Sequence, residues 1–330
     1  TYSSGGTATL YIDGIFDSSV PSLANPTNTN PKFTIGALYT NKSTIASFNG
    51  DIDEVRIWNS ALNVTEIRYI MNQEIEESGT KVNGEIIPKD ITKNDICFHD
   101  WNDLKAYYDM NSLYGTTVED NSNNSYWARI KYLKKDKQIV EGQTAPLPYE
   151  SAANGGTWDT PATWLNNAVQ DLPNSASIVD GNPIDWNIVE TAHNITSGAK
   201  NITVLGLIST AGKLTIDGTI DIITGTGTGQ SLRVTHYLEL DGSIDLEGES
   251  QLVQDEGSIL DADSGGDLER DQQGTANSFN YNYWSSSVGP KALTGTSTRG
   301  TGLPSVSGTV TIGAGTYTHM HQPTILWLHS

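Results

Sequence analysis

Residues 214–260 read LTIDGTIDIITGTGTGQSLRVTHYLELDGSIDLEGESQLVQDEGSIL, and this stretch decides the fold class. It is a series of very short apolar runs, whose first apolar residues are Leu214, Ile220, Leu232, Leu238, Ile244, Leu252 and Ile259. Asp-Gly pairs or single glycines, which favour turns, separate several of the runs. Strands this short and evenly spaced predict a β-solenoid, in which each coil stacks its apolar residues on the coil below. A second, antiparallel β-sandwich is the alternative geometry.

The same part of the chain is strongly acidic, and the spacing of the acids predicts where they lie. From Asp217 to Asp271 there are fourteen acidic residues against two basic ones. Most of them occupy Asp-Gly turns or alternate with apolar residues, as in the run IDLE at 244–247. Because alternation gives a strand one buried and one solvated face, we expect the acids to face water. A glycosidase would instead hold two carboxylates roughly 5–10 Å apart across a sugar.

The first 78 residues also contain sequence patterns that predict β-strands. Residues 7–12 (TATLYI) alternate and end at Asp13-Gly14, which predicts a strand followed by a tight turn. Residues 33–38 (FTIGAL) predict a second strand and residues 48–58 (FNGDIDEVRIW) a third, longer one. On that third strand Asp53 would share the apolar face. Glu54 and Arg56 would lie on the other face as a surface charge pattern.

One helix is expected directly after the third strand. Asn63 and Glu66 have the spacing of a capping box, which satisfies the free N–H groups at a helix start. Apolar residues then recur on one helical face as far as Ile75, and Gly79 is a natural end. The pattern therefore predicts a helix from residue 64 to about residue 78.

Three motifs in this region, LYIDG, FTIGAL and FNGDIDEVRIWNSALNVTEI, resemble the C-terminal half of a laminin-G-like, concanavalin A-type jelly-roll domain. The resemblance covers about residues 1–78 and implies a partial jelly-roll sandwich. Domains of this family often bind calcium, so the resemblance implies Asp51 or Asp53 as a ligand.

The chain divides into four predicted parts. After the half-domain at 1–78 comes a region at 79–150, either a connecting module or a degenerate second laminin-G-like start. The motifs DWNDLKAYYDM and DNSNNSYWA are similar to the beginning of such a unit. A β-solenoid-like module at 151–290 and an uncertain C-terminal segment at 291–330 complete the division.

The motifs DLEGESQLVQ, ERDQQGT and YNYWSS resemble a module of large secreted surface proteins in gliding and polymer-degrading Bacteroidota. The type IX system exports such proteins. The resemblance implies a location outside the cell or on its outer surface, and it defines the chemistry less closely. It also implies that the chain is a fragment of a longer protein.

Two groups of side chains are candidates for binding. Short Asp-rich turns supply the oxygen ligands that calcium prefers, and Asp261, Asp263 and Asp267 lie in one such turn with glycines for the bend. A solvated turn is the alternative. Tyr281, Tyr283 and Trp284 belong to an alternating aromatic run that could stack sugar rings. The alternative is a layer that closes one end of the solenoid.

Three further tryptophans, Trp158, Trp164 and Trp186, sit beside aliphatic residues at strand spacing. We expect them to pack in the core or in a cap, rather than to bind sugar.

Charge and composition narrow the function. A net charge of −20 with only 19 basic residues argues against a nucleic-acid partner. No apolar run approaches the ~20 residues that span a membrane, and the single Cys97 excludes internal disulfides.

We therefore predict an all-β, non-catalytic part of a secreted surface protein. It would be an adhesin or spacer that binds extracellular glycans or surface polymers, with calcium as a structural cofactor. The alternative is an accessory region of a polysaccharide-degrading glycoside hydrolase or lyase.

Overall fold

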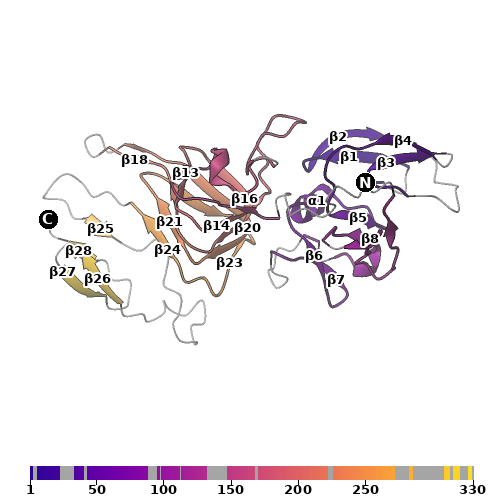
Figure 1. Ribbon diagram of the computed structural model, residues 1–330. Coiled ribbons are helices and arrows are strands. Elements are labelled where there is room, and N and C mark those ends of the chain that lie inside the picture. The colour runs from indigo at the N-terminus through magenta and orange to yellow at the C-terminus, as the bar shows by residue number, and fades with distance from the viewer. Residues whose placement is uncertain are drawn as a thin grey trace.

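Strands form almost all of the regular structure in the computed structural model of the chain (Figure 1). The structure describes residues 1–2, 6–22, 33–40, 43–87, 95–96, 98–111, 113–131, 147–167, 170–221, 226–271, 282–284, 308–312, 315–319 and 326–328. In these residues the helical elements are α1 (Val64–Ile70) and the 3₁₀ turns η1 (Trp101–Asp103) and η2 (Pro161–Thr163). The predicted all-β class is confirmed. No helix in the described part of the chain is long and apolar enough to cross a membrane.

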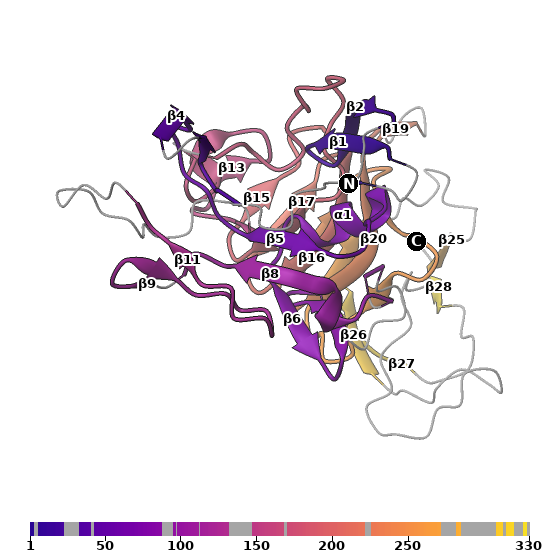
Figure 2. The same ribbon diagram turned by 90° about the vertical axis from the view of Figure 1, so that its right-hand side faces the viewer.

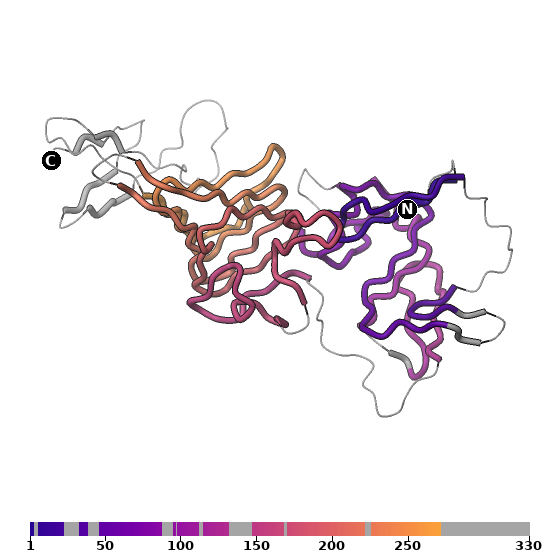
Figure 3. The backbone as a smooth tube through the Cα atoms, turned by 90° about the horizontal axis from the view of Figure 1, so that it is seen from above, coloured from indigo at the N-terminus to yellow at the C-terminus, as the bar shows by residue number. Residues whose placement is uncertain are grey.

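The middle of the chain winds into two parallel sheets, which confirms the predicted β-solenoid. The strands of the first sheet, called the central sheet, are β12 (Tyr149–Glu150), β14 (Ile188–Thr191), β16 (Ile202–Ser209), β20 (Ser231–Leu240), β22 (Gln251–Gln254) and β23 (Ile259–Leu260). Those of the second, called the outer sheet, are β13 (Gly156–Thr157), β15 (Ile195–Thr196), β17 (Lys213–Ile216), β21 (Ser243–Leu246) and β24 (Asp267–Arg270). Each of the first four coils contributes one strand to each sheet, and the last contributes β22 and β23 to the central sheet and β24 to the outer sheet. Figure 3 shows the coils stacked on one another.

The register of the coils places aliphatic residues directly above one another. In the outer sheet Ile195 lies beside Leu214, Leu214 beside Ile244, and Ile244 beside Leu268. These side chains meet those of the central sheet in one core between the two sheets. Each fully buried Leu or Ile contributes about 1.5–3 kcal/mol, so the column holds the coils together.

Two of the predicted short strands are in fact one. The runs LRV and LEL both belong to the ten-residue strand β20. A bulge lies where Val204 and Gly206 of β16 face Val234 and Tyr237 of β20. The bulge adds a residue and interrupts the apolar alternation, which is why the sequence indicates two strands. The run at Ile220 instead leaves the solenoid in a hairpin of β18 (Thr219–Ile220) and β19 (Gly227–Thr228).

The N-terminal body consists of antiparallel pairs. The hairpins are β1 (Ala8–Ile12) with β2 (Ile15–Val20), β3 (Ala37–Thr40) with β4 (Ser43–Ser47), and β6 (Ile75–Ser78) with β7 (Lys81–Gly84). The strand β5 (Val55–Trp58) pairs with β8 (Leu104–Tyr108), and β9 (Leu113–Tyr114), β10 (Thr117–Val118) and β11 (Ala128–Arg129) form a small sheet. The predicted turn at Asp13-Gly14 is confirmed, because both residues have the positive φ, 54° and 75°, that a tight hairpin needs. The division of the chain at residues 78, 150 and 290 stays a prediction.

Both later strand predictions in this body are wrong in extent. The strand expected at residues 48–58 begins only at Val55, because Glu54 has a φ of 51° and breaks the extended backbone. The strand expected at 33–38 begins at Ala37, directly after Gly36, whose φ is 71°.

The capping box at Asn63 and Glu66 is confirmed, but α1 ends at Ile70 and not near Gly79. Arg56 explains the early end, since its guanidinium donates to the carbonyl oxygens of Ile70 and Gln73 at 2.8 and 2.7 Å. These bonds satisfy carbonyl groups that a longer helix would have used.

One core joins the two bodies. Tyr69 and Ile70 of α1, with Ile87 and Ile96, pack against the face of the central sheet that is turned away from the outer sheet. The residues on that face are Ile188, Leu205, Ile208 and Tyr237. Figure 2 shows α1 in front of β16 and β20. The central sheet is therefore covered on both faces, by the outer sheet on one and by the N-terminal body on the other.

The last part of the chain contributes two antiparallel pairs. The strand β25 (Asn282–Trp284) pairs with β28 (Leu326–Leu328), and β26 (Gly308–Ile312) pairs with β27 (Gly315–His319).

Candidate functional site

The acids of the solenoid lie where the sequence predicts. The structure describes all fourteen acidic residues from Asp217 to Asp271, and none of them is buried. In β21, Ile244 and Leu246 are buried, whereas Asp245 and Glu247 between and beside them reach the solvent. The acids therefore lie at the surface of the solenoid, as the alternation predicts.

Several of these acids are paired with the few bases. Lys213 Nζ lies 3.4 Å from Asp245 and 2.6 Å from Glu269, so one ammonium bridges three successive coils of the outer sheet. Arg233 donates to both oxygens of Asp255, at 2.8 and 3.0 Å. Such exposed pairs each contribute at most about 1 kcal/mol to the free energy of unfolding. They therefore stabilise the solenoid much less than its aliphatic core does.

The acids predicted as calcium ligands in the N-terminal body are separated from the apolar face. Asp51 is exposed, and Asp53 is half-buried and accepts the N–H of Glu54 at 3.0 Å. Asp53 does not share a strand face with Val55, because the strand begins after it. In the described residues, no three His, Cys, Asp or Glu side chains are grouped as a metal site would require.

In the predicted Asp-rich turn, the first aspartate accepts hydrogen bonds from within the protein. Asp261 accepts the hydroxyl of Tyr237 at 2.9 Å on one oxygen and the N–H of Asp263 at 2.7 Å on the other. Asp263 and Asp267 are exposed, and Asp267 begins β24. The geometry is that of a turn closed by its first aspartate.

Of the three aromatic residues predicted to bind sugar, the structure describes Tyr283 and Trp284. Tyr281 is outside the described residues. In β25, Tyr283 is opposite Trp327 and Trp284 is opposite Leu326. The sugar platform and the end cap both stay predictions.

The expected packing of the tryptophans is confirmed. Trp158 and Trp164 are fully buried, with their rings edge to face and 5.0 Å apart. Trp158 Nε1 donates to Asn174 at 2.9 Å, and Trp164 Nε1 donates to the carbonyl of Trp158 at 2.8 Å. Trp186 packs elsewhere, at the core shared by the two bodies.

Glu54 and Arg56 are not the surface charge pattern that the sequence indicates. Their side chains are 13% and 8% exposed, and they form an ion pair with each other. The hydroxyl of Tyr107 donates to Glu54 at 3.0 Å. Burial raises the pKa of Glu54 above its usual range, and the charge of Arg56 opposes that shift. Alternation already places Glu54 and Arg56 on one face, but it does not foresee that Tyr107 and the end of α1 cover that face.

A serine, a histidine and a glutamate meet at the start of α1. Ser60 Oγ lies 3.0 Å from His99 Nδ1, and His99 Nε2 lies 3.1 Å from Glu66. The order resembles a nucleophile, a base and an orienting acid. Glu66, however, also accepts the N–H of Asn63 at 2.6 Å as the second half of the capping box. The group thus fixes the helix start against η1.

Polar contacts strengthen the joint between the two bodies. The guanidinium of Arg68 stacks 3.8 Å above the ring of Trp186 and donates to the carbonyl of Gly14 at 2.9 Å. Burial lowers the pKa of Arg68, and Asp180 and Asp185 oppose that shift. On the other side of the joint, His236 lies 2.7 Å from Asp95.

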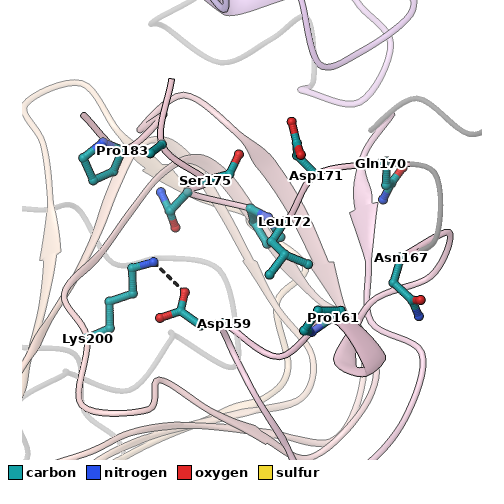
Figure 4. A pocket seen from close by; sticks show the side chains of 12 residues that line it. Asp159, Pro161, Asn167, Gln170, Asp171, Leu172, Ser175, Pro183 and Lys200 are labelled. Carbon is teal, nitrogen blue, oxygen red and sulfur yellow. Dashed lines mark hydrogen bonds and ion pairs between the residues drawn. The ribbon is translucent and has the colours of Figure 1, made fainter. Parts of the chain in front are cut away.

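The structure also contains a pocket with both polar and apolar lining that the sequence does not reveal. Its volume is about 570 Å³, and it lies beside the first coil of the solenoid (Figure 4). Its polar lining comes from Asp159, Asn167, Gln170, Asp171, Asn174, Ser175 and Lys200. These residues belong to three separate loops, and no local motif joins them. Only the folded chain brings them together.

Comparison with known proteins agrees with part of the sequence resemblance. The model of the concanavalin A-like lectin/glucanases superfamily matches residues 1–68. Searches of the curated proteins and of the solved structures find no significant match to the chain. The N-terminal residues are thus similar to concanavalin A-like lectins and glucanases.

Proposed function

We propose that the chain is a non-catalytic, glycan-binding part of a large secreted surface protein, in which the solenoid is a rigid support for a lectin-like region. The observation that carries the proposal is the core shared by the two bodies. Tyr69 and Ile188 are fully buried there, and Leu205 and Tyr237 are each 3% exposed. A flexible linker between two independent domains would leave such side chains in water.

The exposure of the solenoid acids supports the non-catalytic part of the proposal. The net charge of −20 suits a support that stays soluble and does not associate with itself. The motifs shared with surface proteins of Bacteroidota support export by the type IX system to the outer cell surface.

Calcium as a structural cofactor is part of the same proposal. The support for it is the Asp-rich sequence at 261–267 and the calcium binding that the resemblance to laminin-G-like domains implies. The second candidate function is an accessory region of a polysaccharide-degrading enzyme. The superfamily match favours it to the extent that the superfamily includes glucanases as well as lectins.

A glycan array probed with the full chain tests this function. We expect binding to a restricted set of glycans, and a stronger signal with calcium than with a chelator. The expected affinities are about 1 mM to 1 μM, so the array should be read with multivalent display. Absence of signal in both conditions would leave a spacer without binding activity. Release of new reducing or unsaturated sugar ends from the bound polymers would show that the chain is an enzyme.

A further inference from the structure

We propose that the pocket beside the first solenoid coil binds one or two units of a neutral saccharide. This inference rests on the proposed glycan-binding function and adds a second site, outside the lectin-like region. The pocket volume of about 570 Å³ lies within the range of small-molecule sites.

Asn174, which also lines the pocket, is held in place by four hydrogen bonds. Its side-chain amide donates to the carbonyl oxygens of Ile184 and Thr203 at 3.1 and 2.7 Å. Its amide oxygen accepts Trp158 Nε1, and its backbone N–H donates to Asn187 at 2.8 Å. A site that is already ordered loses little entropy when a ligand binds.

The walls of the pocket present both hydrogen-bond donors and hydrogen-bond acceptors. Lys200 and Asp159 form an ion pair of 2.6 Å at one side of the pocket, and Asn167 and Gln170 lie at the other (Figure 4). Ser175 adds a hydroxyl. The ammonium of Lys200 and the hydroxyl of Ser175 donate, whereas carboxylate and amide oxygens accept. The side-chain N–H groups of Asn167 and Gln170 already donate to backbone carbonyls, both at 3.1 Å. Sugar hydroxyls both donate and accept hydrogen bonds. These walls therefore suit a sugar better than a ligand that only donates or only accepts.

The remaining walls are apolar. Pro161, Leu172 and Pro183 expose C–H surfaces to the same space. Such surfaces can cover the C–H face of a sugar ring. No aromatic side chain is among the described residues that line the pocket, so ring stacking is absent there. We therefore expect weak binding, with a Kd of about 1 mM.

Charge selects against acidic sugars. The pocket contains two carboxylates, Asp159 and Asp171, and one ammonium, Lys200. Asp185 also interacts electrostatically with Lys200 from outside the lining. A uronate or sulfate would need an uncompensated positive charge, and Lys200 is already paired. A neutral saccharide meets no such cost.

The test measures saccharide binding to the full chain by saturation-transfer difference NMR, with cellotriose, mannotriose and trigalacturonate as probes. The wild type should bind at least one neutral trisaccharide and should bind trigalacturonate about tenfold more weakly. Lys200→Ala should weaken the neutral complex about tenfold, because it removes a charge-assisted donor. The matched control is Lys213→Ala, which breaks an ion pair of the same 2.6 Å length on the outer sheet. It should bind like the wild type.

Each outcome has a defined meaning. Equal binding by Lys200→Ala and Lys213→Ala would overturn the pocket while leaving glycan binding by the chain intact. Preference for trigalacturonate would overturn the choice of a neutral ligand. Failure of the wild type to bind any of the three probes overturns the pocket proposal. A positive array in that case shows that the proposed function stands without it. Unchanged circular dichroism of the Lys200 variant excludes misfolding as the cause of a loss.

Discussion

Replacement of Trp158 by alanine is expected to lower the free energy of unfolding by about 3–5 kcal/mol, as for other buried aromatic residues. The side chain is fully buried, and its ring packs edge to face on that of Trp164 at 5.0 Å. The variant leaves a cavity beside the first coil and removes the donor that Asn174 Oδ1 accepts. Urea unfolding followed by far-ultraviolet circular dichroism measures the loss.

Tyr126→Ala provides the control for this variant. Its side chain is largely exposed, with 61% of the residue surface accessible, so its replacement should change stability by less than about 0.5 kcal/mol. If Trp158→Ala were as mild as Tyr126→Ala, the tryptophan pair could not be an essential part of the solenoid core.

Replacement of Arg56 by methionine is expected to cost about 3–5 kcal/mol, because it leaves a buried carboxylate without its partner. The variant also removes the donors to the carbonyl oxygens of Ile70 and Gln73. An exposed pair of the kind that the sequence indicates would cost at most about 1 kcal/mol. The exposed Arg129, replaced by methionine, gives the control.

The pH dependence identifies Glu54 as the source of the loss. Burial already raises the pKa of Glu54, and without Arg56 the largest opposing charge is gone. A carboxyl whose pKa is raised by folding stabilises the fold below its unfolded pKa, about 4.3, and this contribution disappears as the pH rises through the folded pKa. The deficit of Arg56→Met relative to the wild type should therefore be smaller near pH 4 than at about pH 7.5. A deficit that is equal at both values would contradict the assignment. Addition of Glu54→Gln should recover part of the loss at about pH 7.5.

The sequence predicts local features of this fold well. The aliphatic column through Leu214 and Ile244, the turn at Asp13-Gly14 and the capping box at Asn63 all follow from patterns within a few residues. Period-two alternation also predicts that Asp245 faces water. In each case the neighbours along the chain determine the environment of the residue.

Features that depend on distant partners could not be predicted. The end of α1 is set by Arg56, which lies fourteen residues before Ile70. The pair of Glu54 and Arg56 looks exposed in the sequence, but Tyr107 and the end of α1 bury it in the fold. The pocket beside the first coil needs Asp159 and Lys200 from different loops, and their contact spans 41 residues of sequence. Single-sequence patterns carry no signal for such contacts.

The N-terminal body and the solenoid are joined by one shared core, so they should behave as a single unit. Separate unfolding of either body would expose Tyr69, Leu205 and Tyr237, which are at most 3% exposed. Differential scanning calorimetry of the full chain measures this coupling directly. We expect both bodies to unfold together in one cooperative transition. Two well-separated transitions, with the parallel sheets intact after the first, would contradict it.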